Sequence, residues 1–274
     1  MSPRFPLWIL IISLLLGGCS LLPKEEDETK GLPAQKLFEV ATDAMKSGDY
    51  ETAIKYYESL EAQYPFGPLA MQSQLNVAYA YYQFEEPESA IAAVDRFIKL
   101  HPQNPAAAYA WYFRGIVNFN RTQGLFERFL PTDPSQRDPG AAYNAYKDFN
   151  EVVQRFPESE YAKDARLRML FIANNLARHE LHVASYYMDR GAYLAAANRA
   201  QYVLENYQRS PVMKEALILM IAAYDKLGLK DLSADTRKVL DYNEAHGVFE
   251  TEGPETGEKS WARKLWEYFK FDQK

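Results

Sequence analysis

The fold is decided by the stretch Gly48-Asp49-Tyr50-Glu51-Thr52-Ala53-Ile54, which continues with Tyr57, Leu60 and Tyr64-Pro65. Similar residues return at shifts of 37, 92 and 143 positions, where the central small residue is Ala90, Ala145 and Ala196. A weaker fifth copy runs through Leu227-Gly228, Ala234 and Val239-Leu240. A motif that recurs in this way indicates a stack of similar structural units.

Each copy has the chemistry of one helix in a helical hairpin. Gly48 permits a sharp turn before the helix, Ala53 lets a second helix approach closely, and Pro65 stops the helix from continuing. The apolar residues between them recur three or four positions apart, which is the spacing of a buried helix stripe. This pattern is typical of the second half of a tetratricopeptide repeat, and apolar stripes before the copies supply the first halves.

The sequence therefore predicts an all-α fold, a tetratricopeptide-repeat solenoid of about five helix-turn-helix repeats over residues 35–245. A generic helical bundle is the alternative. The spacing is uneven at two places. Ala90 and Ala145 are 55 residues apart, and we assign the surplus of roughly 20 residues to a loop at 120–140 that packs on the solenoid or docks a partner. We also expect an unusually long helix before Gly191, at roughly residues 174–190.

The N-terminal residues have the features of a secretion signal. Arg4 precedes an apolar run at residues 7–16, which is too short to span a bilayer, since spanning takes about 20 residues. Leu16-Gly17-Gly18-Cys19 resembles the bacterial lipobox, in which the cysteine carries the lipid. We expect residues 1–18 to be a lipoprotein signal peptide and 19–34 an acylated tether that holds the chain at a membrane. An ordinary signal peptide with an incidental cysteine is the alternative.

The C-terminal residues form a separate region of the sequence. Residues 246–260 are rich in Gly, Glu, Thr and Pro and are predicted to be a linker. Residues 261–274 are predicted to form an amphipathic helix, because Trp261, Leu265, Tyr268 and Phe269 share one helical face. Such a helix can cap the repeats, dock into a partner or lie on lipid, and all three alternatives stay open.

Composition and motifs give no support to catalysis or nucleic-acid binding. The net charge is −6, whereas nucleic-acid-binding domains usually carry a basic surplus. The sequence contains neither a Gly-rich phosphate loop nor a G-x-S-x-G elbow. His179 and His182 lack the zinc-protease spacing and an apparent third ligand, so we interpret them as surface or groove residues. We expect no cofactor, no metal site and no enzymatic activity.

Several motifs fix residues that repeat packing leaves free. They are Tyr64-Pro65-Phe66-Gly67-Pro68, Ala78-Tyr79-Ala80-Tyr81-Tyr82, Asp95-Arg96-Phe97-Ile98, Arg114-Gly115, Arg137-Asp138-Pro139 and residues 184–193. With these motifs the chain resembles the BamD family, lipoprotein subunits of the outer-membrane β-barrel assembly machinery, from the lipobox to about Asn243. Residue 20, directly after the lipobox cysteine, is Ser and not Asp. By the enterobacterial sorting rule that this resemblance implies, such a lipoprotein is delivered to the outer membrane.

The resemblance implies a lipid-anchored protein on the periplasmic face of the outer membrane. Its C-terminal repeats would bind the periplasmic domains of BamA, with BamC and BamE as further partners. Its N-terminal repeats would receive unfolded β-barrel proteins through their C-terminal signals. A repeat lipoprotein that serves peptidoglycan or cell-division partners is the alternative, and a metal-dependent hydrolase using His179 and His182 is a third hypothesis.

Five residues are candidates for these contacts. Arg199 matches a family position tied to BamA contact, and Arg190 is a second candidate for the same partner. For the substrate we single out Tyr64, Phe66 and Arg96, because aromatic side chains beside an arginine suit a peptide that ends in phenylalanine and a carboxylate. The alternatives are that Arg199 is an ordinary solvated residue and that Tyr64 and Phe66 belong to the core between repeats.

Overall fold

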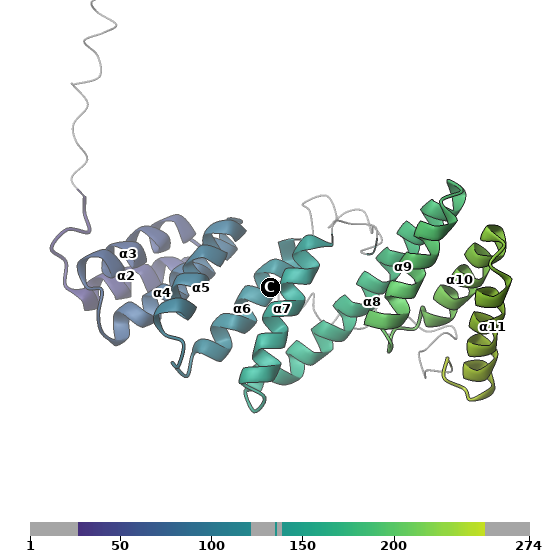
Figure 1. Cartoon of the computed structure of the whole chain (residues 1–274). Helices are drawn as coiled ribbons and strands as arrows, with labels where there is room; N and C mark the ends of the chain where they lie inside the picture. Colours follow the sequence, from purple (N-terminus) through teal and green to yellow (C-terminus); the bar gives the residue numbers. More distant parts are fainter. Residues whose placement is uncertain (1–26, 122–134, 136–138, 250–274) are drawn as a thin grey trace, which may run out of the picture.

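The computed structural model describes residues 27–121, 135 and 139–249, and within these residues it contains ten helices and no strand. Consecutive helices pack against each other in an extended stack that runs from α2 to α11 (Figure 1). The five hairpins are α2 (Ala34–Ser47) with α3 (Tyr50–Gln63), α4 (Pro68–Gln83) with α5 (Pro87–Leu100), α6 (Ala107–Arg121) with α7 (Gly140–Arg155), α8 (Glu160–Asp189) with α9 (Tyr193–Asn206), and α10 (Met213–Leu227) with α11 (Lys230–Ala245). The predicted all-α solenoid of five helix-turn-helix repeats is confirmed.

The second helices of the first four hairpins end in the same way. Their last turns are followed by ring-bearing residues with φ between −130° and −133°, namely Tyr64, His101, Phe156 and Tyr207. In the first three hairpins the next residue is proline, which cannot continue a helix and disfavours helical backbone in the residue before it. The helix stop predicted from the sequence is therefore confirmed at these positions.

The turns that precede the second helices depend on local backbone chemistry. Gly48 has φ of 81°, in the left-handed region that glycine adopts without steric cost, and its N–H bonds the carbonyl of Met45 at the end of α2. Asp49 then caps α3, because its carboxylate accepts a hydrogen bond from the backbone N–H of Thr52 at 3.1 Å. Gly228 repeats the left-handed turn between α10 and α11, with φ of 73°.

Small residues lie where the helices of a hairpin cross. Ala53, Ala90, Ala145 and Ala196 are all fully buried, as the repeated motif predicts. Larger apolar side chains fill the space on either side of them, including Tyr57, Phe97, Phe149 and Val203. The core is therefore a continuous row of small clusters along the stack, and each hairpin packs mainly against its neighbours.

The fourth repeat differs from the sequence prediction, and the prediction for the third is largely untested. The long helix expected at roughly residues 174–190 is present, but its predicted start is wrong, since α8 is one continuous helix of 30 residues from Glu160 to Asp189. Most of the loop predicted at 120–140 lies outside the described residues, as do Cys19 and the predicted C-terminal helix at 261–274. Among the described helices, none is long and apolar enough to cross a membrane.

Candidate partner-binding and peptide-binding sites

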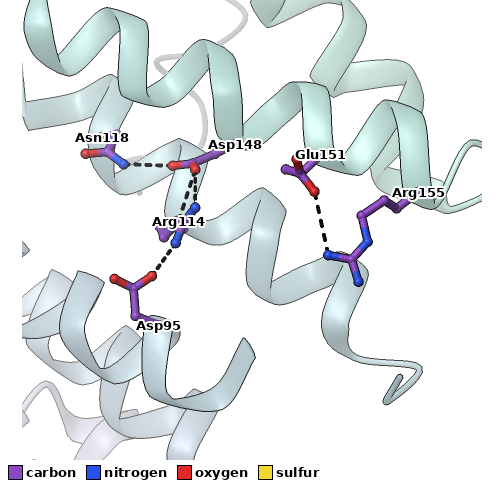
Figure 2. A network of polar contacts seen from close by, with 6 residues as sticks. All are labelled: Asp95, Arg114, Asn118, Asp148, Glu151 and Arg155. Atoms are coloured by element: carbon purple, nitrogen blue, oxygen red, sulfur yellow. Dashed lines mark hydrogen bonds and ion pairs between the residues drawn. The ribbon is translucent and has the colours of Figure 1, made fainter. Parts of the chain in front are cut away.

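A largely buried ion-pair network joins the second and third repeats. Figure 2 shows Arg114 of α6 between Asp95 of α5 and Asp148 of α7. The guanidinium donates to Oδ1 of Asp148 from Nε at 3.0 Å and from Nη2 at 2.6 Å, and Nη1 donates to Asp95. Asn118 donates to the second oxygen of Asp148 at 2.8 Å. The network thus links three helices across the junction between the second and third repeats.

Burial and charge act against each other at Asp148. Burial raises the pKa of its carboxyl group, while the hydrogen bonds and charge of Arg114 lower it.

Two arginines near this network make further contacts. The Arg114 guanidinium lies 4.2 Å from the centre of the Trp111 ring. Figure 2 also shows Arg155 of α7 paired with Glu151, at 3.6 Å. Both side chains of the Arg155–Glu151 pair are about 40% exposed, so this pair contributes less to stability than the more buried pair of Arg114 and Asp148.

Gly115 allows α7 to approach α6 closely. A Cβ atom at this position would lie 2.7 Å from Cε1 of Phe149, a ring that is fully buried. The sequence motif Arg114-Gly115 thus has two structural roles on adjacent residues, one polar and one steric. Both roles concern the packing of the third repeat and its junction with the second.

The predicted partner-binding residue Arg199 lies on α9 and reaches α8. Its Nη1 donates to Oε2 of Glu180 at 2.8 Å, and this hydrogen bond raises the pKa of the guanidinium. The Glu180 side chain is only 6% exposed, whereas the Arg199 side chain is 45% exposed. One side of Arg199 is therefore anchored in the fold while the rest faces solvent.

Arg190, the second candidate, lies at the C-terminal end of α8. Its guanidinium lies 5.2 Å from the ring centre of Tyr186, a side chain that is 54% exposed. Tyr186 in turn packs edge-on against Tyr187. Arg190 thus belongs to an exposed cationic and aromatic surface at the turn between α8 and α9. Residue types of this kind are enriched in the energetically dominant parts of protein interfaces.

The substrate candidates Tyr64 and Phe66 lie in the connection between α3 and α4. Phe66 is 90% exposed, so the alternative that it belongs to the core between repeats is wrong. Tyr64 is 37% exposed, and its hydroxyl donates to the carbonyl of Leu32 at 3.0 Å. This contact ties the start of the first repeat to the end of α3. The structure therefore presents the Phe66 ring to solvent, two residues after the anchored Tyr64.

Arg96, the third substrate candidate, lies on α5 and pairs with Glu61 of α3 at 3.1 Å. The Arg96 side chain is 50% exposed and that of Glu61 is 12% exposed. Burial raises the pKa of Glu61 to about 6, although the charge of Arg96 opposes the shift. Glu61 lies one helical turn before Tyr64, so the structure brings Arg96 to the same end of α3 that carries the aromatic residues.

The two histidines have structural contacts. Nδ1 of His179 lies 2.8 Å from the carbonyl oxygen of Ser135, and Nε2 of His182 lies 2.9 Å from the Ser135 hydroxyl. Ser135 is buried, with 1% exposure. Across residues 27–121, 135 and 139–249, no group of three or more His, Cys, Asp or Glu side chains is arranged to hold a metal ion. Both histidines therefore serve to hold Ser135 against α8.

Comparison with known proteins shows to which family this chain belongs. A family model described as outer membrane lipoprotein, YfiO, matches residues 30–240. A relative from Neisseria meningitidis serogroup A is named outer membrane protein assembly factor BamD and is 43% identical over 92% of this chain and 96% of its own length. The chain belongs to the BamD family. A further BamD from Xylella fastidiosa is 36% identical over 88% of this chain and 83% of its own length.

BamD membership agrees with the resemblance drawn from the sequence motifs. A BamD from Vibrio cholerae is 34% identical over 86% of this chain and 96% of its own length. Among solved structures, the tetratricopeptide-repeat domain of P58(IPK) has a TM-score of 0.41 and 13% identity, covering 79% of this chain and 52% of that one. The assignment of the fold rests on the helices described above.

Three polar residues of these sites were not predicted from the sequence. Asp148, Asn118 and Glu180 are all buried, and they hold the arginines in place directly or through one another. A signal was available for Asp148, which directly precedes Phe149 of the predicted apolar stripe, because a charged residue beside a buried stripe is seldom buried unless it is paired.

Proposed function

We propose that this BamD-family chain is a scaffold for the assembly of outer-membrane β-barrel proteins, anchored by lipid on Cys19 and facing the periplasm. The observation that carries the proposal is the similarity to proteins named outer membrane protein assembly factor, at 43% identity over 92% of the chain. A stack of helical hairpins supports it, because such stacks offer long surfaces for protein binding. The match to a family described as outer membrane lipoprotein supports the location.

The C-terminal repeats are proposed to bind the periplasmic domains of BamA, with BamC and BamE as further partners. Arg199 and Arg190 are the proposed contact residues. The Glu180 carboxylate fixes one side of the Arg199 guanidinium at 2.8 Å and so limits the side-chain entropy lost on binding. Arg190 and the exposed Tyr186 ring add a second cationic contact near the start of α9.

The N-terminal repeats are proposed to receive the substrate. The exposed ring of Phe66 offers an aromatic contact to an apolar side chain of an unfolded barrel protein. Arg96 is half exposed and can pair with a terminal carboxylate. Tyr64 supports the end of α3 through its hydrogen bond to Leu32. Together these residues suit a peptide that ends in an aromatic residue.

Two other hypotheses receive less support. Family membership does not favour a scaffold for peptidoglycan or cell-division partners, since the relatives are named as assembly factors for outer membrane proteins. A hydrolase using His179 and His182 is not favoured either, because both histidines contact the buried Ser135. The repeat fold and the family together favour a scaffold without catalysis.

The test is affinity purification of the tagged, full-length chain from membranes, followed by mass spectrometry. Recovery of a large barrel protein with repeated periplasmic domains supports the proposal, whereas recovery of cell-wall or division proteins alone overturns it. Arg199→Glu should reduce that recovery at least tenfold. Arg121→Glu, which changes an exposed arginine of α6, is the matched control and should leave recovery unchanged.

A second variant separates a direct contact from a fold effect. Glu180→Gln keeps a hydrogen-bond acceptor for Arg199 but removes the negative charge of the carboxylate that pairs with Arg199 inside the protein. If Arg199 binds the partner directly, this variant retains recovery close to that of the unchanged chain. A loss as large as that of Arg199→Glu, with an unchanged helical circular-dichroism signal, would remove Arg199 from the proposed contacts.

A further inference from the structure

The outer surface of α11 differs from that of every other second helix in the stack. The repeats can be aligned by their buried small residue, which is Ala53, Ala90, Ala145, Ala196 and Ser233. In the fifth repeat the prediction of Ala234 from the sequence motif is wrong by one position, since Ala234 is exposed and Ser233 is buried. In this alignment α11 carries Leu232, Val239 and Tyr242, which are 47%, 49% and 62% exposed. The earlier helices carry mostly small or polar residues there: Thr52, Ser59 and Ala62; Ser89, Arg96 and Lys99; Asn144, Glu151 and Gln154; Ala195, Tyr202 and Glu205. We call Leu232, Val239 and Tyr242 the outer stripe.

The outer stripe is not the surface on which a sixth repeat would pack. In the same alignment, Arg237 of α11 corresponds to residues of the four earlier repeats that are fully buried, namely Tyr57, Val94, Phe149 and Ala200. In α11 this position is a charged residue that is 56% exposed and pairs with Asp225 at 3.4 Å. Glu244, further along the same face, pairs with Lys214 of α10 at 2.8 Å. The stacking face is therefore polar, as expected at the end of a solenoid, and the apolar residues lie on a different side of the helix.

We propose that residues 261–269 of this same chain cover the outer stripe. These residues lie outside the described part of the chain, but their sequence places Trp261, Leu265, Tyr268 and Phe269 on one helical face. As a helix, this face would be about 12 Å long, and the outer stripe from Leu232 to Tyr242 is about 15 Å long. The two apolar surfaces thus match in length as well as in chemistry.

The connection is long enough for this contact. Eleven residues lie between Phe249, the last described residue, and Trp261, and an extended chain of that length reaches about 40 Å. The same short connection keeps the segment at an effective concentration in the millimolar range beside α11. A separate partner that competes for the stripe would have to overcome this advantage, which favours the chain's own segment as occupant.

Charge also favours the contact. Asp231 and Asp235 lie beside the outer stripe on α11, at a spacing of one helical turn, and Asp235 pairs with Lys238 at 2.8 Å. Residues 261–274 contain four basic side chains, against two acidic ones; the basic ones are Arg263, Lys264, Lys270 and Lys274. Opposite charges at the edges of the contact select the orientation in which the apolar faces meet.

The test places a photo-crosslinking amino acid at Val239 in the full-length chain, expressed in cells. Crosslinked peptides are then identified by mass spectrometry. We expect them to join position 239 to residues 261–270 of the same molecule, without an increase in mass. The same probe at Arg237, on the stacking face, is the control and should give at least fivefold less of this product. Crosslinks to another protein, to a second copy or to lipid as the main product would overturn the proposal.

A pair of matched variants completes the test. Leu265→Glu places a charge on the apolar face of the segment and should reduce the crosslink from position 239 at least fivefold. Gln273→Glu introduces the same side chain, also in place of a neutral residue, beyond the proposed segment and should reduce it much less. Equal crosslinking by both variants would show that the apolar face does not make the contact.

Discussion

Arg114 donates two hydrogen bonds to a single carboxylate oxygen of Asp148, although 34 residues separate the two in the sequence. The Asp148 side chain is 4% exposed and that of Arg114 is 20% exposed, so neither charge is well solvated. Removing the cation would leave a buried carboxylate without its main partner. The contact therefore makes the junction between α6 and α7 sensitive to single substitutions.

Arg114→Met should lower the free energy of unfolding by about 3 kcal/mol, because it leaves Asp148 buried and uncompensated. Urea unfolding followed by circular dichroism measures the change. Arg121→Met is the control on the same helix, since Arg121 pairs with an exposed Glu88 at 2.7 Å. Such an exposed pair contributes less than about 1 kcal/mol. Equal losses for the two variants would contradict the weight given to burial.

Gly115→Ala should lower stability by about 1–3 kcal/mol, despite the better helix propensity of alanine. The new methyl group would meet the Phe149 ring at 2.7 Å, where the core has no room. Phe149→Leu in the same chain should recover part of this loss, because it removes the ring atoms that clash. Thermal unfolding of both single variants and the double variant measures the coupling. Additive effects would show that the two residues do not interact.

Glu61→Gln should stabilise the protein at pH 7.5 by on the order of 1–2 kcal/mol. Burial raises the pKa of Glu61 from 4.5 to about 6 in the folded chain, so protonation favours folding. That contribution is fully present below pH 4.5 and is lost as the pH rises through 6. The gain from the neutral glutamine should therefore shrink to nothing as the pH falls below 4.5. Unfolding curves of both proteins across this range check the prediction, and a destabilised variant at neutral pH would refute it.

Phe66→Ala should leave stability within about 0.5 kcal/mol of the unchanged protein, because the ring is 90% exposed. The same variant should weaken binding of a peptide with a C-terminal phenylalanine, by roughly tenfold, under the proposed function. Fluorescence anisotropy with a labelled peptide measures the affinity. Leu100→Ala, at the 57% exposed last residue of α5, is the control and should bind as the unchanged chain does. Unaltered binding by Phe66→Ala would exclude this residue from the peptide site.

Much of the helix order was predictable from the sequence because its signals are local. Gly48 and Gly228 mark left-handed turns, the buried alanines mark helix crossings, and Pro65, Pro102 and Pro157 mark helix ends. Each signal depends on backbone geometry within a few residues. The start of α8 at Glu160 was not predicted because its first turns carry many charged residues, so the apolar stripe is clear only in the second half of the helix.

The candidate sites were predictable only in part. The motifs pointed to Arg114 and Arg96, and the family resemblance to Arg199, but neither names the carboxylates that these arginines meet. The partners lie on other helices, and their distance depends on how the hairpins stack. Exposure was equally hidden, since the sequence left open whether Phe66 was core or surface.

The sequence by itself determined the all-α repeat architecture and the family, because both follow from residue types at fixed spacings along the chain. Only the tertiary structure decided that Arg114 meets Asp148, that Arg199 is anchored by Glu180, and that the outer stripe of α11 is uncovered among the described residues. The physical reason is how far apart in the sequence the interacting residues lie. Turns and helix ends obey local backbone preferences, whereas ion pairs and exposed faces depend on the packing of helices that are distant in sequence.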